Sequence, residues 1–154
     1  CVTRTDDPPS PPTPDPIESP EPSPPQSRFE VRDNGQTVYD NDLRRYWTRN
    51  SAPTGLNLSA ARIYCNSLTL TGRNWRMPSN VELRSLKQNE SRRCQLPDEF
   101  AQNHCGYTWT DTACDRSWVN LIVDFNGSPV DDYSGIGALC QNPNEEKVVF
   151  CITN

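Results

Sequence analysis

Ten prolines fall within the first 28 residues of this 154-residue chain, and they restrict any folded core to the residues after them. Proline fixes φ and pushes the preceding residue into an extended conformation, so such a run favours polyproline II helix. About 25 residues in that conformation reach roughly 70–80 Å. We therefore expect residues 1–28 to be an extended, semi-rigid tether and residues 29–154 to form one folded domain.

The first residue, Cys1, has the position of a cysteine acylated after cleavage of a bacterial lipoprotein precursor. A tether directly after it fits this hypothesis, because a lipid on Cys1 would hold the domain at a membrane. Val2 favours the outer membrane, since aspartate at this place is the usual inner-membrane retention signal. We expect an outer-membrane lipoprotein of a Gram-negative bacterium, on the periplasmic or the surface-exposed face. The alternatives are an arbitrary start of the sequence and an ordinary disulfide-bonded cysteine.

The net charge of −5 is unevenly distributed, because residues 1–28 carry −3 and leave the domain near neutral. Neither part has the strongly basic balance of a nucleic-acid-binding protein, so no nucleic-acid partner is expected. The sequence also has no run of about 18 apolar residues, and it therefore predicts no transmembrane helix.

Six further cysteines lie in the domain, and an even number in a small, apolar-poor domain indicates three disulfides formed in an oxidising compartment. Residues 87–106 are polar and bounded by cysteines, which predicts a loop closed by Cys94–Cys105. A zinc site at Cys94, His104 and Cys105 is the alternative. The sequence lacks a C-x-x-C pair and has a single histidine, so we expect no metal.

The remaining disulfides are inferred from a predicted hairpin. Asn126-Gly127 is a strong turn signal, and folding the chain there places residue 114 roughly opposite residue 139. This geometry predicts Cys114–Cys140. Cys65 then remains for Cys151, which would tie a helix to the last strand.

Two helices are predicted from capping signals and apolar periodicity. Asn57 or Ser59 can cap a first helix over residues 60–68, and Ser79 with Glu82 forms a capping box for a second. The residues expected on the buried face of the first helix are Ala60, Ile63, Tyr64 and Leu68. Those expected on the buried side of the second helix are Val81, Leu83 and Leu86.

Alternating patterns predict short antiparallel strands around these helices. The expected strands cover residues 29–31, 37–39, 107–110, 118–125, 130–133 and 148–152, with a turn at residues 33–35. The last of them is apolar throughout and is expected at the centre of a sheet. Together the elements predict an α+β domain with three disulfides.

Several motifs occur in order along the domain. They are residues 33–41 (DNGQTVYDN), 46–50 (YWTRN), 60–68 (AARIYCNSL), 74–79 (NWRMPS), 107–110 (YTWT) and 123–127 (VDFNG). This ordered set resembles the C-terminal-domain family of Legionella collagen-like protein, which is similar to C-type lectin-like domains. The resemblance implies two helices flanking a small twisted antiparallel sheet, with a disulfide from the first helix to the final strand. It also implies an extracytoplasmic bacterial module, often a lipoprotein or an adhesin.

Nine arginines fall between residues 44 and 93, and clustered arginines can bind sulfated glycans, phosphates or an acidic protein. The candidate ligand or partner surface consists of Arg44, Arg45, Arg49, Arg73, Arg92 and Arg93. The alternative is a set of solvated arginines balanced by nearby carboxylates. The tryptophans are expected in the core; they are Trp47, Trp75, Trp109 and Trp118.

Catalysis is not expected. His104 is the only histidine and lies beside Cys105, away from any serine nucleophile and acid, and the cysteines are expected in disulfides. Oxygen ligands for calcium occur around Asn126, Asp131 and Asp132 and in residues 141–146, but the lectin tripeptides Glu-Pro-Asn and Gln-Pro-Asp are absent. No cofactor beyond a lipid on Cys1 is therefore predicted.

Two functions of different classes remain. The first is a non-catalytic accessory subunit of an envelope or surface assembly, in which residues 2–28 run along a membrane-protein partner that the domain binds. The second is a surface adhesin that binds glycans or glycosaminoglycans through the same domain, as the collagen-like founder of the family does.

Overall fold

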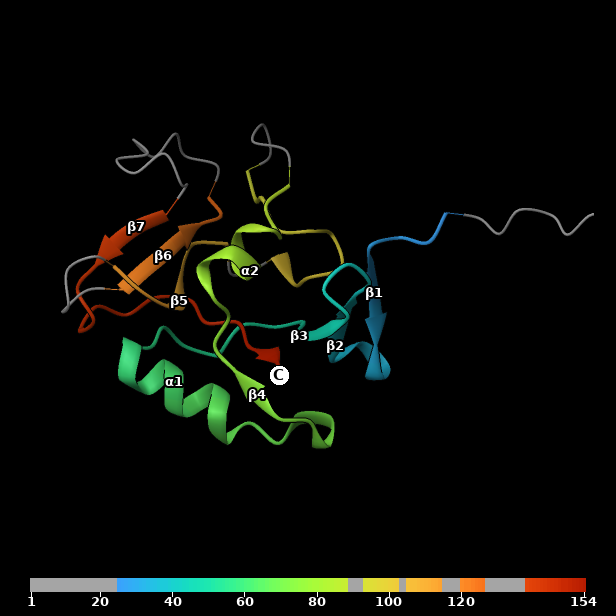
Figure 1. Cartoon of the computed structure of the whole chain (residues 1–154), viewed down its shortest axis with the longest axis horizontal. Coiled ribbons are helices and arrows are strands. Elements are labelled where there is room, and N and C mark those ends of the chain that lie inside the picture. The colour runs from blue at the N-terminus through green and yellow to red at the C-terminus, as the bar shows by residue number, and fades with distance from the viewer. Residues whose placement is uncertain (1–24, 89–92, 103–104, 115–119, 127–137) are drawn as a thin grey trace, which may run out of the picture.

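The structure, a computed structural model, describes residues 25–88, 93–102, 105–114, 120–126 and 138–154 (Figure 1). Cys1 and almost all of the predicted tether lie outside these ranges. The described residues form two α-helices and two antiparallel sheets, which confirms the predicted α+β class. No helix in these ranges is long and apolar enough to cross a membrane.

The larger sheet has five strands in the order β1-β2-β3-β8-β4, each pair antiparallel. Its strands are β1 (Phe29–Arg32), β2 (Thr37–Asp40), β3 (Arg45–Thr48), β4 (Trp75–Arg76) and β8 (Ile152–Thr153). The predicted turn between β1 and β2 is present, where Asn34 and Gly35 have φ of 55° and 83°. Asparagine and glycine adopt this left-handed conformation more easily than other residues.

The C-terminal segment supplies an inner strand of the larger sheet, where β8 lies between β3 and β4, but this strand is shorter than the one predicted over residues 148–152. Only Ile152 and Thr153 form a regular strand, but the residues before them bond to neighbours on both sides. Val148 N–H donates to Tyr107 O (2.9 Å), and Cys151 O accepts from Thr48 N–H (2.9 Å). The segment therefore joins the second sheet to the interior of the first.

The smaller sheet consists of β5 (Tyr107–Ala113), β6 (Asn120–Asp124) and β7 (Ala138–Gln141), in that order. Its first two strands agree with the predicted ones. The predicted strand over residues 130–133 lies outside the described residues, and the described partner of β6 is β7. Leu139 pairs with Ile122 rather than lying opposite residue 114, so the register inferred from the Asn126-Gly127 turn is wrong.

Three disulfides join the domain, in the pairs that the sequence predicts. They are Cys65–Cys151, Cys94–Cys105 and Cys114–Cys140, with Cα–Cα distances of 5.5, 5.6 and 6.0 Å. These distances lie in the usual range for disulfides. Cys114 comes directly after β5 and Cys140 lies on β7, so their bridge joins the two outer strands across the end of β6 rather than closing a two-stranded hairpin.

Helix α1 (Leu58–Ser67) begins at Asn57, whose side chain accepts from Ala60 N–H at 2.9 Å. Its predicted buried face is partly wrong, because Ile63 is 66% exposed. The residues of α1 that are buried are Leu58, Ala61 and Cys65. Because Cys65 is bonded to the buried Cys151, the side of α1 that carries these three residues faces the core.

Helix α2 (Asn80–Arg84) has the predicted capping box. Ser79 Oγ accepts from Glu82 N–H (3.3 Å), and Glu82 Oε2 accepts from Ser79 N–H (2.8 Å). Leu83 is fully buried as predicted, but Val81 is 77% exposed, which overturns its predicted core position. The buried residues of α2 are instead Asn80 and Leu83, which are three positions apart and share one side of the helix. Val81 follows Asn80 by one residue, so its side chain is rotated by about 100° from that of Asn80.

The core on one face of the five-stranded sheet centres on an aromatic ring from the 93–102 segment. The Phe100 ring makes edge contacts with Phe29, Trp47 and Phe150, at centroid distances of 6.0, 6.2 and 5.8 Å. The segment predicted as a polar loop therefore supplies a core residue. Three predicted core tryptophans are buried, namely Trp47, Trp75 and Trp109, and Trp118 lies outside the described residues.

We expect the double variant Cys65→Ala/Cys151→Ala to lose about 4.5 kcal/mol of unfolding free energy, because this bridge closes a long loop. The bridge spans 86 residues, whereas Cys94–Cys105 spans 11. The matched double variant Cys94→Ala/Cys105→Ala should lose about 3 kcal/mol by the same reasoning. Urea titrations of both variants measure the difference; an equal or larger loss at Cys94–Cys105 would contradict the role given to Cys65–Cys151.

Glu82 gives the fold an acid-sensitive contact. Burial raises the pKa of this carboxyl, but hydrogen bonds from Arg76 and Ser79 outweigh it and lower the pKa from 4.5 to about 2. A lowered folded-state pKa stabilises the fold above pH 4.5, and this contribution is lost as the pH falls towards 2. We expect Glu82→Gln to cost about 2 kcal/mol at pH 7, and the difference from the parent to vanish near pH 2.

Denaturant titrations of Glu82→Gln and the parent at pH 7, 4.5, 3 and 2 test this expectation. Glu145→Gln is the matched control, because it removes the half-exposed ion pair with Lys147. Such a pair contributes little to stability. A Glu82→Gln penalty that stayed constant down to pH 2 would contradict the assignment.

Candidate binding surface

Two tyrosines lie side by side on the face of the five-stranded sheet opposite the Phe100 core. Alternation along β2 and β3 buries Val38 and Trp47 on the core side and places Tyr39 and Tyr46 on the other. Tyr39 and Tyr46 are directly opposite in register, and their ring centroids lie 4.8 Å apart. Both residues are half-buried, and Tyr46 also packs against a core cluster that contains Ala61 and Cys65 of α1.

An arginine lies over each tyrosine. The guanidinium carbon of Arg32 lies 5.6 Å from the Tyr39 ring centroid, and that of Arg73 lies 3.7 Å from the Tyr46 ring centroid. Cation–π attraction favours this placement. The four residues Arg32, Tyr39, Tyr46 and Arg73 form what we call the tyrosine–arginine row.

Carboxylates balance the charge of the row. Arg32 pairs with Glu30, and Arg73 Nη1 lies 2.8 Å from Asp33 Oδ2. A hydrogen bond from Asn41 and the contact with Arg32 lower the pKa of Glu30. The Thr37 hydroxyl and, to a smaller extent, Arg73 lower the pKa of Asp33. At neutral pH the row therefore combines ring faces, guanidinium donors and carboxylate acceptors without a large net charge.

The structure brings together only part of the predicted arginine surface. Arg73 belongs to the row, and Arg44 and Arg45 come directly before Tyr46 at the start of β3. Arg45 donates to the Thr153 carbonyl (2.8 Å), and within the described ranges neither Arg44 nor Arg45 pairs with a carboxylate. Arg45 lies opposite Asp40 in register, so alternation along β3 places it on the other face of the sheet from Tyr46.

The other predicted arginines do not join this surface. Arg49 Nε donates to the Glu99 carbonyl (2.9 Å), which fastens the 93–102 segment to β3. Arg93 is exposed in that segment, and Arg92 lies outside the described residues. Sequence analysis missed Arg32, Tyr39 and Tyr46. Pairing the two strands across their turn would have placed the tyrosines opposite each other.

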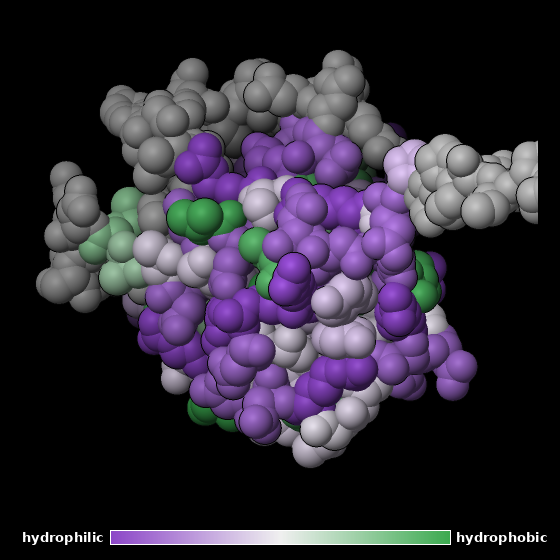
Figure 2. All heavy atoms as spheres, turned by 45° about the vertical axis from the view of Figure 1, so that its right-hand side comes forward, coloured by the Kyte–Doolittle hydropathy of each residue, from purple (hydrophilic) through white to green (hydrophobic). Residues whose placement is uncertain are grey.

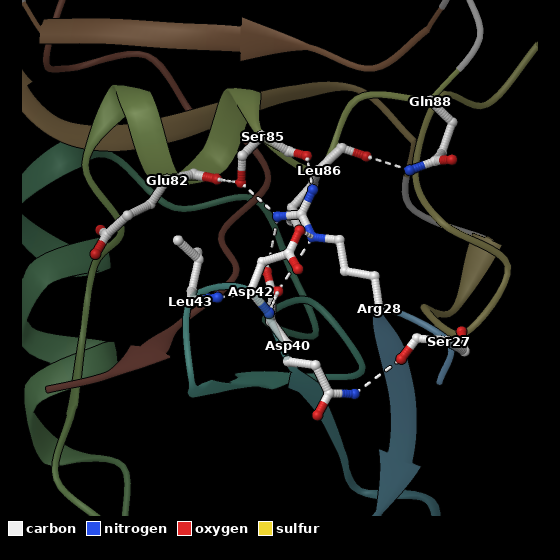
Figure 3. A network of polar contacts seen from close by, with 10 residues as sticks. Ser27, Arg28, Asp40, Asp42, Leu43, Glu82, Ser85, Leu86 and Gln88 are labelled. Atoms are coloured by element: carbon white, nitrogen blue, oxygen red, sulfur yellow. Dashed lines mark hydrogen bonds and ion pairs between the residues drawn. The ribbon is translucent and has the colours of Figure 1, made fainter. Parts of the chain in front are cut away.

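A second feature missed by the sequence analysis is a clamp at the start of the domain. The tether prediction includes Arg28, but its Nε and Nη2 donate to the two carboxylate oxygens of Asp40 at 3.1 and 2.9 Å. Its Nη1 and Nη2 also donate to Ser85 O (2.8 Å) and Ser85 Oγ (3.0 Å), just after α2 (Figure 3). We call Arg28, Asp40 and Ser85 the Arg28 clamp.

Burial of Asp40 makes the clamp strong. The side chain of Asp40 is fully buried, and its Oδ1 also accepts from Asp42 N–H (3.0 Å). A buried carboxylate is stable only when its charge and hydrogen bonds are compensated. The clamp therefore fixes the point at which the N-terminal segment leaves the domain, on the β1 side and away from the three-stranded sheet (Figure 1).

Hydrophobic side chains do not form a broad docking patch on the face shown in Figure 2, which is mostly hydrophilic with small separate hydrophobic areas. The exposed large hydrophobic residues of the described ranges come from four different elements; they are Val31, Ile63, Val81 and Tyr107.

No cluster of three or more histidine, cysteine, aspartate or glutamate residues in the described parts of the chain could hold a metal ion. Cys94 and Cys105 are disulfide-bonded and offer no thiolate to zinc. His104 and the calcium candidates Asp131 and Asp132 lie outside the described residues, and Asn126 is exposed.

We expect Arg28→Met to reduce the unfolding free energy by about 2 kcal/mol, because it leaves the buried Asp40 without its charged partner. Arg32→Met is the matched control, since Arg32 pairs with Glu30 on the exposed edge strand and such pairs contribute little. Chemical denaturation of the two variants measures the contrast. Equal effects would show that the clamp is no stronger than a surface ion pair.

The comparisons with known proteins give one match. The family model described as the Lcl C-terminal domain matches residues 36–142, more than two thirds of the chain. Searches of curated proteins and of solved structures each found no significant match. The matched stretch contains Tyr39 and Tyr46 of the row, both helices and the smaller sheet. The chain therefore belongs to the Lcl C-terminal domain family.

Proposed function

We propose that the protein is a non-catalytic accessory subunit of a bacterial envelope or surface assembly. A lipid on Cys1 holds it in the outer membrane, residues 2–28 run along a membrane-protein partner, and the domain binds that partner. The observation that carries the proposal is the Arg28 clamp, in which a buried carboxylate holds the junction between tether and domain. A rigid junction orients the domain relative to its anchor, as docking onto a membrane partner requires.

We further propose that the domain has a C-type lectin-like fold. Three features support it. The strand before the first helix, β3, pairs antiparallel with the last strand, β8, which brings early and late parts of the chain together. A disulfide joins α1 to the residue just before β8, and a separate three-stranded sheet comes after the second helix.

The composition of the tyrosine–arginine row supports a protein partner. Tyrosine and arginine are enriched at the energetic centres of protein interfaces, where charged groups are paired and partly desolvated. Here each arginine of the row already has a carboxylate partner and a ring beneath it. Such a preorganised surface loses little side-chain entropy on binding.

An adhesin that binds glycans is the alternative, and the same row supports it. Sugar rings stack on aromatic faces, while guanidinium and carboxylate groups bond to hydroxyls. Arg44, which is exposed just before β3, would add attraction for sulfate groups. The two proposals therefore share a surface but differ in partner and in salt dependence.

Extraction of the native protein in mild detergent tests the first proposal. We expect an acylated Cys1 in the intact mass and one membrane protein in stoichiometric amount. We expect Tyr39→Ser/Tyr46→Ser to reduce the copurified partner at least tenfold, because it removes both rings of the row. The control is Tyr107→Ser, which removes a tyrosine ring from β5 of the smaller sheet, where Lys147 contacts it. This variant should still copurify with the partner.

Two other results would contradict the accessory-subunit proposal, and each points to a different conclusion. An acylated but solitary protein that binds heparin, with affinity falling as salt rises from 50 to 200 mM, would favour the adhesin. A native Cys1 without acyl chains would overturn both anchored versions. Thermal unfolding of the tyrosine variant shows whether a lost partner reflects the surface or the stability of the domain.

A further inference from the structure

Strand β1 has one unpaired edge in the part of the chain that the structure describes. It is the first strand in the order β1-β2-β3-β8-β4, and it pairs only with β2. Figure 1 shows it as the outermost strand on its side of the domain. An open strand edge is a template for pairing with another chain. The backbone groups and side chains of β1 therefore decide what can pair there.

The backbone of Val31 faces this open edge. The carbonyl of Arg28 accepts from Asn41 N–H (2.8 Å), which adds a hydrogen-bonded pair to the β1–β2 ladder. Bonded and non-bonded pairs alternate in an antiparallel ladder, so Glu30 and Arg32 bond to β2, whereas Val31 does not. The N–H and C=O of Val31 therefore point away from β2, and no described residue bonds to either group.

The side chains of β1 alternate between the two faces of the sheet. Val31 shares a face with Phe29 and with Val38 of β2, and at the edge of the sheet it is 43% exposed. Glu30 and Arg32 lie on the other face and pair with each other, and the Arg32 side chain is 48% exposed. The edge thus presents one apolar side chain between two opposite charges.

We propose that β1 is the interface of a homodimer, in which two copies of the chain pair antiparallel about a two-fold axis at Val31. The Val31 N–H of each copy donates to the Val31 carbonyl of the other, and the two Val31 side chains meet on one face. On the opposite face, Glu30 of each copy lies opposite Arg32 of the other. This contact occurs twice by symmetry.

Charge selects this register over its neighbours. A two-fold axis at Glu30 would place two carboxylates opposite each other, and an axis at Arg32 would do the same with two guanidinium groups. Opposite charges across a strand pair are stabilising, whereas like charges are destabilising. The axis at Val31 also makes Glu30 and Arg32 a non-hydrogen-bonded pair, the type whose Cα atoms approach to about 4.5 Å. Side-chain charge and backbone hydrogen bonding thus favour the same register.

The same pattern favours a second copy over an unrelated strand. A strand that complements β1 needs an arginine opposite Glu30 and a glutamate opposite Arg32, and β1 read in the antiparallel direction supplies both. Charged side chains also serve to protect sheet edges from pairing. Charges of one sign would do so in every register, but the two opposite charges of β1 attract in the register centred on Val31.

The dimer would join two larger sheets into one continuous sheet. The two-fold axis is perpendicular to the sheet, so both tyrosine–arginine rows would lie on the same face, on either side of the paired β1 strands. A partner with two binding sites would then bind with increased avidity. This consequence rests on the proposed function, whereas the dimer itself needs neither a lipid nor an envelope partner.

Sedimentation equilibrium of the full, unacylated chain tests the proposal, with Cys1→Ser to prevent disulfides between copies. Each β1 contributes only four residues, so we expect a weak dimer that forms between about 10 μM and 1 mM protein. Val31→Pro should weaken self-association at least tenfold, because proline has no N–H to donate. Proline is tolerated on an edge strand where its nitrogen faces outwards, so the domain should still fold. Val31→Ala keeps the N–H and should weaken association less.

Charge variants test the register. Glu30→Arg and Arg32→Glu each place like charges opposite at both symmetric contacts, and each should weaken self-association at least fivefold. An equimolar mixture of these two variants restores opposite charges at both contacts, and it should associate at least fivefold more tightly than either variant alone. Arg62→Glu is the matched control, because it reverses one charge of a similarly exposed pair with Asp111 and should leave association unchanged.

Three results would overturn the proposal. A chain that remains monomeric up to about 1 mM has no such dimer. Association that Val31→Pro leaves unchanged would lie on another surface, and a mixture no tighter than its two components would exclude the register. The mixture also controls for folding, because only folded variants can recover association. These samples contain neither lipid nor envelope partner, so failure of the dimer is distinct from failure of the accessory-subunit proposal.

Discussion

The fold depends on the C-terminal segment that lies between the two sheets. Its backbone bonds to β5 through Val148 and to β3 through Cys151, and the Cys65 disulfide fastens α1 to the same place. Buried backbone groups must find hydrogen-bond partners, and this segment provides them for strands that are far apart in the sequence. Both core clusters contain side chains from it, Phe150 in one and Val149 in the other. The disulfide to Cys151 thus fixes α1 against the same segment that joins the two sheets.

The Arg28 clamp and the tyrosine–arginine row use opposite faces of the same small group of strands. Asp40 is buried on the core side of β2, whereas Tyr39, one residue earlier, faces outwards. The clamp fixes Arg28 beside β1 and β2, so the start of the described domain and the tyrosine–arginine row share one edge of the larger sheet.

Much of the local structure could be predicted from the sequence. The Asn57 cap, the Ser79–Glu82 capping box and the turn at residues 33–35 depend on neighbouring residues, and they are present as predicted. Predictions that required a choice of buried face were less accurate. Ile63 and Val81 are apolar and lie on helices, yet both are exposed, because distant partners decided how each helix is turned. The binding surface was likewise only partly predicted, since Arg32 and Tyr39 lie beside Tyr46 and Arg73 only after three strands have paired.

The sequence by itself determined the α+β class, the two capped helices, the presence of three disulfides and membership of the Lcl C-terminal domain family. These features depend on local propensity, on cysteine spacing and on ordered motifs. Only the tertiary structure decided that Arg28 belongs to the domain, that Phe100 fills its core and that two tyrosines meet between two arginines. Each of these depends on contacts between residues distant in the chain, and burial and charge compensation, rather than local sequence, select such contacts.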